Sequence, residues 1–181
     1  MAFPQVQSVT ASTFSSDVTT HNVNMPATVN PGDLLLCIFT NDGSATVTTP
    51  GGWTAKGTQL SGNSGVRQSI FTKIAVGNED GGAVNFQTSA SEKAVAQIYR
   101  ITGAFQDAAN GVATASSQDP GSEVNNPDPP NLSPGWGVMD ILWLVSAGPS
   151  DSTADAVSSY PAGYGSGTYT TSGSAIDQAQ C

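Results

Sequence analysis

One pattern of strand, polar loop and tight turn occurs twice in this chain, and its second occurrence is cut short. The first copy has the apolar run Asp-Leu-Leu-Leu-Cys-Ile-Phe at 33–39 and the turn Pro-Gly-Gly-Trp at 50–53. The second has Asp-Ile-Leu-Trp-Leu-Val at 140–145 and Pro-Ala-Gly-Tyr at 161–164. A doubled unit predicts one β-sandwich made of two similar halves. We expect a single domain over 1–181, with a first half of about 1–115, a crossover loop of about 116–135 and a second half of 136–181.

The second half is expected to be incomplete at its C-terminus. After its turn, the first copy continues with strand-like segments at 66–75, 83–88 and 92–102, whereas the second continues only with 174–181. A sheet without its last strands would expose backbone edges and apolar side chains. We therefore expect either that the native chain runs further or that another chain supplies the missing strands.

Helical periodicity is absent almost everywhere, and short runs rich in Val, Thr, Ile and Phe alternate with clusters of turn-forming residues. This pattern is typical of many short strands. In 66–75, the side chains at even positions are expected to face the core and those at odd positions to be partly exposed. The continuous apolar runs at 34–39 and 141–145 predict strands buried on both faces, or central strands in an oligomer. The predicted strands are 5–11, 18–24, 34–40, 45–48, 53–59, 66–75, 82–88, 92–102, 109–115, 137–146, 153–158 and 174–181.

Charge is scarce and unevenly distributed. Charged residues make up 10% of the chain, and the net charge is −9. All the Lys and Arg residues precede residue 101, so the second half is acidic without a compensating base. Such a surface repels phosphate and disfavours nucleic-acid binding. A solvated acidic surface explains this asymmetry, and head-to-tail packing between copies is the alternative.

The sequence shows no signal peptide, no membrane-spanning segment and no disulfide framework. The N-terminus lacks the basic and apolar regions of a signal peptide, and no apolar run is long enough to cross a bilayer. We expect a soluble chain made in a reducing cytoplasm, without membrane partners. Cys37 is predicted to be a small buried hydrophobe, while Cys181 is the last residue.

No constellation of catalytic residues is found in the sequence. His21 is the only histidine, no Gly-x-Ser-x-Gly elbow accompanies it, and we expect an exposed strand histidine. Asp33 and Asp140 begin equivalent strands, so a shared structural role explains them better than paired acid–base chemistry. The sequence predicts no catalytic residue, no cofactor and no enzyme activity.

Metal binding is also not predicted. One histidine and two distant cysteines do not form the ligand cluster of a structural zinc site. Asp119, Glu123 and Asp128 share one loop and carry oxygen ligands suited to calcium, but they lack the spacing of a known calcium loop.

Three aromatic residues are the candidates for ligand or subunit contact: Trp53, Trp136 and Tyr164. Trp53 and Tyr164 follow equivalent turns in the two copies, and Trp136 lies in a Pro/Gly-rich segment. Aromatic rings of this kind stack on sugars, which favours carbohydrate binding. The alternative is that Trp53 and Tyr164 are amphipathic packing residues at the ends of the sandwich, and their repetition favours this interpretation.

Several segments resemble a family of tailed-bacteriophage virion proteins, which are Ser/Thr/Gly-rich β-sandwich proteins of the "GDLL … P-x-GW" type. In the first half they are Pro-Gly-Asp-Leu-Leu-Leu at 31–36, Thr-Pro-Gly-Gly-Trp-Thr at 49–54, Phe-Thr-Lys-Ile-Ala at 71–75 and Ile-Tyr-Arg-Ile-Thr-Gly-Ala at 98–104. In the second half they are Trp-Gly-Val-Met-Asp-Ile-Leu-Trp at 136–143 and Tyr-Pro-Ala-Gly-Tyr at 160–164. The resemblance covers nearly the whole chain from residue 30 onward.

The resemblance implies a jelly-roll-like sandwich and a non-enzymatic structural role in a phage particle. We expect a capsid decoration (cement) protein that binds the major capsid protein or other virion proteins and forms a homo-oligomer. It would be located in the virion after assembly in the bacterial cytoplasm. A tail- or fibre-associated adhesin that binds host-surface carbohydrate is the alternative. The N-terminal arm and the 116–135 loop are the candidates for contacts with neighbours, because an arm can add a strand to another subunit's sheet.

Overall fold

The computed structural model describes residues 3–60, 65–104, 111–117, 130–136, 142–147, 167–172 and 177–180. In this part of the chain every regular element is a β-strand, and no helix occurs. The prediction of an all-β chain without substantial helix is therefore confirmed for these residues. The strands are β1 (Gln5–Asn24), β2 (Leu34–Asp42), β3 (Val47–Thr48), β4 (Thr54–Leu60), β5 (Val66–Ile74), β6 (Ala83–Thr102), β7 (Ser146–Ala147), β8 (Thr168–Thr171) and β9 (Asp177–Gln180).

Six strands form one antiparallel sheet in the order β1-β6-β2-β5-β4, with β3 paired to β6. The central strand is β2, in which Leu34 lies opposite Ile101 of β6 and Ile74 of β5. Every β2 residue except the last is buried. The apolar run at 34–39 is therefore a strand covered on both faces within one chain, which is the first of the two interpretations drawn from its sequence.

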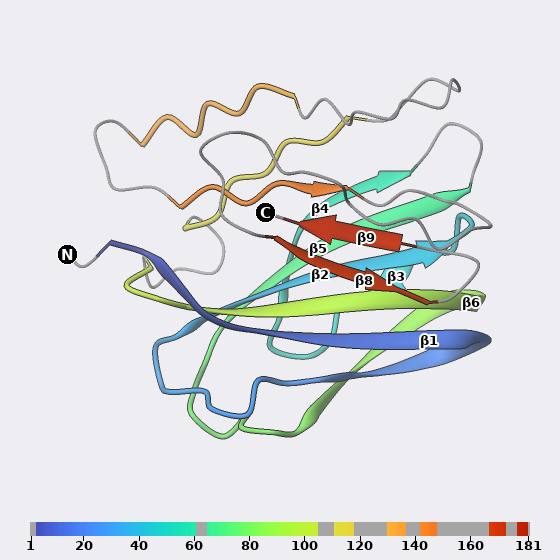
Figure 1. The fold of residues 1–181 in the computed structure, drawn as a ribbon, viewed down its shortest axis with the longest axis horizontal. Helices are drawn as coiled ribbons and strands as arrows, with labels where there is room; N and C mark the ends of the chain where they lie inside the picture. Colours follow the sequence, from blue (N-terminus) through green and yellow to red (C-terminus); the bar gives the residue numbers. More distant parts are fainter. Residues whose placement is uncertain are drawn as a thin grey trace.

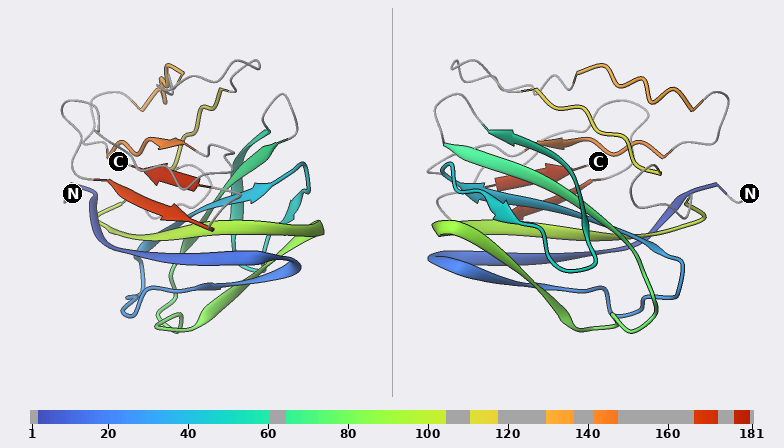
Figure 2. Two further views of the ribbon diagram at one scale, coloured as in Figure 1. Left: turned by 45° about the vertical axis from the view of Figure 1, so that its right-hand side comes forward. Right: turned by 180° about the vertical axis from the view of Figure 1, so that it is seen from behind.

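The long strands β1 and β6 bend sharply together, at a place that we call the crease. Their register shifts between Phe14 and Val18, and again between Val18 and Thr20. Bulges of this kind bend and twist a strand pair. Beyond the crease, the second half of β1 and the first half of β6 pass across one face of the sheet (Figures 1 and 2). The predicted strands 5–11 and 18–24 are thus two arms of β1, and 82–88 and 92–102 are two arms of β6.

The larger hydrophobic core fills the space between the sheet and these bent arms. Phe86, on the first arm of β6, contacts the rings of Phe39 and Phe71 at centroid distances of 5.5 and 5.1 Å. Each buried side chain of this size stabilises the fold by about 1.5–3 kcal/mol relative to an exposed one. The bend therefore brings aromatic residues from distant parts of the chain into one cluster. Its buried members are Val23, Met25, Val29, Leu35, Cys37, Phe39, Trp53, Phe71, Ala75, Phe86, Ala94, Ala96 and Ile98.

The predicted facing of 66–75 is right in part: the even-numbered residues face a core, but the odd-numbered ones, expected to be partly exposed, include residues of the larger core. Phe71 and Ala75, at odd positions, belong to the larger core, whereas Ile70 and Ile74 pack only partly buried on the opposite face. Both faces of β5 are covered, so apolar residues occur on each and their alternation does not identify the larger core. The space between the sheet and the bent arms determines which face of β5 meets the larger core, because the Phe71 ring fits there.

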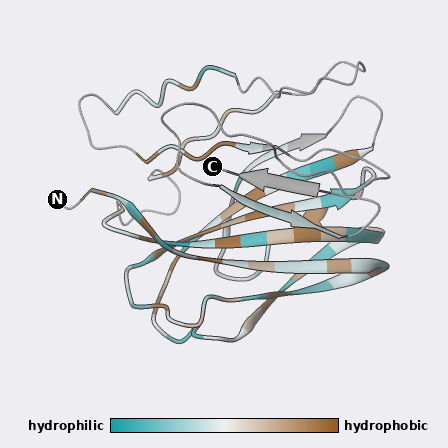
Figure 3. Ribbon diagram, in the orientation of Figure 1, coloured by the Kyte–Doolittle hydropathy of each residue, from teal (hydrophilic) through white to brown (hydrophobic). Residues whose placement is uncertain are grey.

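A smaller core lies on the opposite face of the six-stranded sheet. Its buried members are Leu34, Leu36, Ile38, Tyr99 and Ile101. The remaining strands form a second sheet in the order β7-β9-β8, which lies over this face (Figures 1 and 2). Side-chain hydrogen bonds join the sheets: the Gln97 amide donates to Thr170 Oγ1 at 2.5 Å, and the Gln68 amide donates to Ser146 Oγ at 3.0 Å. Along β6, apolar and polar residues alternate in short runs (Figure 3).

The second copy of the repeated pattern is described only in part. The segments 137–141 and 148–166 lie outside the described residues, and they include the predicted strand 153–158 and the turn at 161–164. Within the predicted strand 137–146, residues 142–145 have no regular structure and β7 begins at 146. Residues 111–117 form no strand, contrary to the prediction for 109–115, and β8 has no counterpart among the predicted strands. The described parts of the 116–135 loop contain no regular element, as expected.

Candidate functional site

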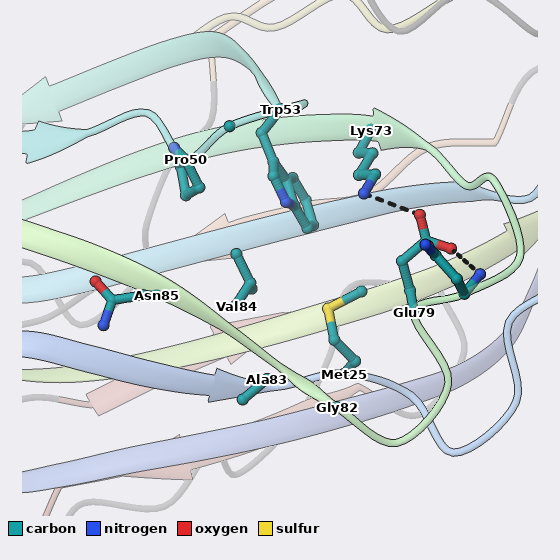
Figure 4. Close-up of a pocket in the computed structure, with 11 residues that line it drawn as sticks. Met25, Pro50, Trp53, Lys73, Glu79, Gly82, Ala83, Val84 and Asn85 are labelled. Carbon is teal, nitrogen blue, oxygen red and sulfur yellow. Dashed lines mark hydrogen bonds and ion pairs between the residues drawn. The ribbon is translucent and has the colours of Figure 1, made fainter.

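An open pocket of about 420 Å³ lies at one end of the larger core. Its walls come from the residue after β1, the turn before β4, the end of β5, the β5–β6 turn and the start of β6 (Figure 4). Apolar and polar side chains contribute together, which suits a small polar ligand with one apolar face. The lining residues are Met25, Pro50, Gly51, Trp53, Lys73, Asn78, Glu79, Gly82, Ala83, Val84 and Asn85.

Trp53 is positioned by the predicted tight turn. Its backbone N–H donates to Pro50 O at 3.1 Å, and Gly52 takes a φ of 78° that favours glycine. The Trp53 ring packs edge-on against Phe86 at 5.9 Å, and only 8% of the residue is exposed. Trp53 is therefore mainly a packing residue, as the alternative interpretation predicts, and only an edge of its ring is available to a ligand (Figure 4).

The charged wall of the pocket is an ion pair between Lys73 Nζ and Glu79 Oε1, 2.9 Å apart. The Glu79 carboxylate also accepts hydrogen bonds from the backbone N–H groups of Val76, Gly77 and Asn78 at 3.1, 2.8 and 3.0 Å. Burial by itself would raise the pKa of Glu79, but the Lys73 hydrogen bond and the three N–H donors lower it to about 2. Glu79 is therefore ionised at neutral pH.

Two polar side chains of the pocket already have partners within the protein. Glu79 is held by Lys73 and the β5–β6 turn, and the Asn85 amide donates to Asn22 Oδ1 at 3.0 Å. A carboxylate with a pKa near 2 is a poor general acid or base at neutral pH. A ligand in this pocket would lie along the edge of Trp53, between Asn85 and Lys73 (Figure 4).

The structure does not bring the three predicted aromatic candidates together. Trp53 lines the pocket. Trp136 is half-buried in the segment 130–136 and is not among the residues that line the pocket. Tyr164 lies outside the described residues, as do Asp119, Glu123, Asp128 and Asp140.

The expectation that His21 is exposed is wrong. Its ring is fully buried between Phe14 and Phe39, at centroid distances of 4.9 and 5.2 Å. Nε2 lies 3.2 Å from the carbonyl oxygen of Glu92. Burial lowers the pKa of His21, opposed by backbone hydrogen bonds to Glu92 and Phe86. The crease encloses this ring, and the local sequence carries no sign of the crease.

Cys37 and Asp33 have the structural roles that the sequence predicts. Cys37 is fully buried in the larger core, and desolvation raises the pKa of its thiol. Asp33 Oδ2 accepts hydrogen bonds from the Arg100 side chain at 2.6 Å and from the Asn30 N–H at 2.8 Å. Asp33 therefore ties the start of β2 to β6.

Two carboxylate sites were not predicted: the Glu79–Lys73 pair, and a contact between Glu92 and Asp42 at the crease. The sequence marks 79–82 as a turn but carries no signal for the partners of Glu79. Among the described residues, no group of three or more His, Cys, Asp or Glu is placed to hold a metal ion. The same residues contain no helix with the length and hydrophobicity needed to cross a bilayer.

No protein-family model, curated protein or solved structure matches this chain at a significant level.

Proposed function

We propose that this chain is a non-enzymatic structural protein of a bacteriophage particle that decorates the capsid as a cement protein. The resemblance of its sequence motifs to tailed-phage virion proteins supports the proposal. We also propose that the bent six-stranded sheet and the strands over its other face form a jelly-roll-like sandwich of two similar halves. The larger core between the bent arms supports this architecture.

The observation that carries the proposal is the long edge strand β1. It extends over 20 residues and, among the described strands, pairs only with β6. Phe3, just before this strand, is 47% exposed, and Val6, near its beginning, is 37% exposed. An unpaired edge beside exposed apolar side chains is suited to strand addition by a neighbouring subunit, either the major capsid protein or another copy of this chain.

Cryo-electron microscopy of intact particles tests the location. We expect density for this fold at the symmetry axes of the capsid. Density on the tail alone would favour the adhesin, and its absence from both head and tail would contradict a structural role in the virion.

Binding to capsids that lack the protein tests the arm. Phe3→Ser and Val6→Ser together should lower occupancy at least about tenfold, because apolar burial at an interface is lost. Val76→Ser is the matched control, because Val76 is 66% exposed in the β5–β6 turn, away from the arm. Equal occupancy for both variants would rule out the arm as the contact.

The second candidate function is binding of host-surface carbohydrate by a tail-associated protein. The pocket beside the Trp53 edge, with the amide groups of Asn78 and Asn85, favours it. Glycan-array binding that Asn85→Ala abolishes would support this function. Trp53→Ala is unsuitable for the test because it would also disturb the core.

A further inference from the structure

The crease between the arms of β1 and β6 gathers acidic side chains from three strands. Glu92 of β6 lies there in register with Val18, between the two register shifts of β1. Asp42, at the end of β2, contacts the Glu92 carboxyl group, and Asp17 of β1 contributes a further negative charge nearby. These carboxyl groups thus lie where the sheet changes direction.

Hydrogen bonds to the Glu92 and Asp42 carboxyl groups connect the turn after β2 with β6. One carboxyl group lies on β6 and accepts from the turn, and the other lies at the end of β2 and accepts from β6. The Glu92 carboxyl accepts a hydrogen bond from the Ala45 N–H at 3.2 Å, and the Asp42 carboxyl accepts one from the Lys93 N–H at 2.8 Å. Gly43 packs directly against the Glu92 carboxyl group, because a Cβ added there would be 3.0 Å from both Glu92 oxygens. The turn at 42–46 therefore closes tightly on the carboxyl groups.

The contact between the two side chains requires a proton. Ionised carboxylates only accept hydrogen bonds, so the hydrogen bond between Glu92 and Asp42 needs one of them to be protonated. Two carboxyl groups in contact also resist ionising together. Desolvation, followed by the Asp42 hydrogen bond and the charges of Asp42 and Asp17, raises the pKa of Glu92 to about 7, although the Ala45 N–H opposes this.

We propose that the crease is a proton-operated latch, in which a proton on Glu92, donated to Asp42, holds the 42–46 turn against β6. Loss of this proton near neutral pH leaves two carboxylates in contact and loosens the turn. β3, which follows the turn and pairs with Thr88 and Gln87 of β6, loosens with it. The latch does not depend on the function proposed above, because it concerns the fold itself.

Other charged groups face the latch from the neighbouring strands. Arg67 of β5 donates two hydrogen bonds to Ser44 O, at 3.2 and 3.0 Å, and so holds the turn independently of the proton. Lys93 follows Glu92 on β6 and contributes the backbone N–H described above. His21 contacts the Glu92 carbonyl oxygen rather than its carboxyl group.

The sign of the pH dependence follows from these groups. The pKa of Glu92 is about 7 in the folded state and 4.5 otherwise, so its stabilisation is complete below about pH 4.5 and is lost as the pH rises through 7. His21 has the opposite sign, because its pKa is lowered from 6.5 and its stabilisation is lost as the pH falls below that value. From pH 6 to 8, loss of the latch proton should raise the unfolding equilibrium constant about tenfold.

The test measures denaturant unfolding and amide hydrogen exchange from pH 6 to 8. In the wild-type chain we expect a net rise of about two- to tenfold in the unfolding constant, because the His21 contribution opposes the latch by up to about fourfold over this range. We also expect a loss of protection at the Ala45 and Lys93 amides beyond the intrinsic pH effect. Glu92→Gln should not show this rise, because the Gln amide donates to Asp42 at every pH while its oxygen still accepts from Ala45. Asp42→Asn should behave in the same way, by donating to Glu92.

Glu79→Gln is the matched control, because it removes a glutamate outside the crease and should keep the wild-type slope between pH 6 and 8. A flat wild-type profile would overturn the latch, as would an unchanged slope in Glu92→Gln and Asp42→Asn. If one variant does not fold, the other decides. If neither folds, the wild-type exchange profile at Ala45 and Lys93 decides alone.

Discussion

Glu79 and Glu92 carry the same side chain, but the fold shifts their pKa values in opposite directions. Both are desolvated, which favours the protonated form. Around Glu79, Lys73 and three backbone N–H donors outweigh desolvation and keep the carboxylate ionised. Around Glu92, the neighbouring groups are themselves acidic and add to desolvation. The balance of donors and acceptors around each carboxyl therefore decides its charge.

Glu79→Gln should lower the stability at pH 7 by about 2 kcal/mol, because a neutral amide loses the Lys73 ion pair and the favoured ionisation. The pKa of Glu79 in the folded state, about 2, lies below its ordinary value of 4.5. Its contribution is therefore present above about pH 4.5 and is lost as the pH falls toward 2.

Urea denaturation at pH 7 and at pH 3 measures this effect. The difference between Glu79→Gln and the wild type should shrink at pH 3. A difference that is the same at both values would mean that packing, rather than charge, explains the loss.

At the scale of single elements, the turns between strands depend on glycines with positive φ. Gly52 has a φ of 78° and Gly77 a φ of 89°. A Cβ at Gly52 would meet only the end of the flexible Lys73 side chain at 3.8 Å, whereas a Cβ at Gly77 would lie 2.6 Å from Pro31 Cγ. The two turns therefore share a backbone requirement, and the β5–β6 turn adds a steric one.

Gly77→Ala should destabilise the chain by about 2–4 kcal/mol, because backbone strain adds to a clash with the Pro31 ring. Gly52→Ala should cost only about 1 kcal/mol, from backbone strain alone. Chemical denaturation of the two variants side by side measures the difference. Equal losses would show that the close approach of Pro31 relaxes without cost.

At the scale of the whole molecule, one aromatic cluster holds the bent arms against the sheet. Phe86 lies on the first arm of β6 and contacts Phe39 on β2, Trp53 in the turn at 50–53 and Phe71 on β5. These residues are far apart in the chain, so the cluster forms only when the sheet is complete. Its loss should affect the stability of the whole sheet rather than of one hairpin.

Phe86→Ala should lower the free energy of unfolding by about 3–5 kcal/mol, since it removes a fully buried ring and leaves a cavity. Val76→Ala, at an exposed site, should change it by less than about 0.5 kcal/mol. Cooperative unfolding followed by circular dichroism and by Trp fluorescence measures both variants. A loss below about 1 kcal/mol for Phe86→Ala would mean that the arms pack independently of this ring.

The local patterns of the sequence were sufficient for most of the strands and turns between residues 5 and 102. The run at 34–39 predicts a strand buried on both faces, and the glycines at 43, 52 and 81 have the positive φ values that turns need. The burial of Cys37 also follows from its apolar neighbours. These features depend on residues close together in the chain, where side-chain alternation and backbone preferences act directly.

Only the tertiary structure decided which residues distant in the sequence contact one another. The crease makes His21 a core residue, turns Phe71 rather than Ile70 toward the larger core, and joins Asp42 to Glu92. The candidate pocket was predicted only through Trp53, because Lys73 and Glu79 meet at a turn whose sequence carries no signal of their pairing. The alternation of side chains along a strand shows which residues share a face, but it does not show which other elements pack on that face. Long-range strand pairing and the volume between layers select the partners, and the neighbouring residues of the sequence do not encode them.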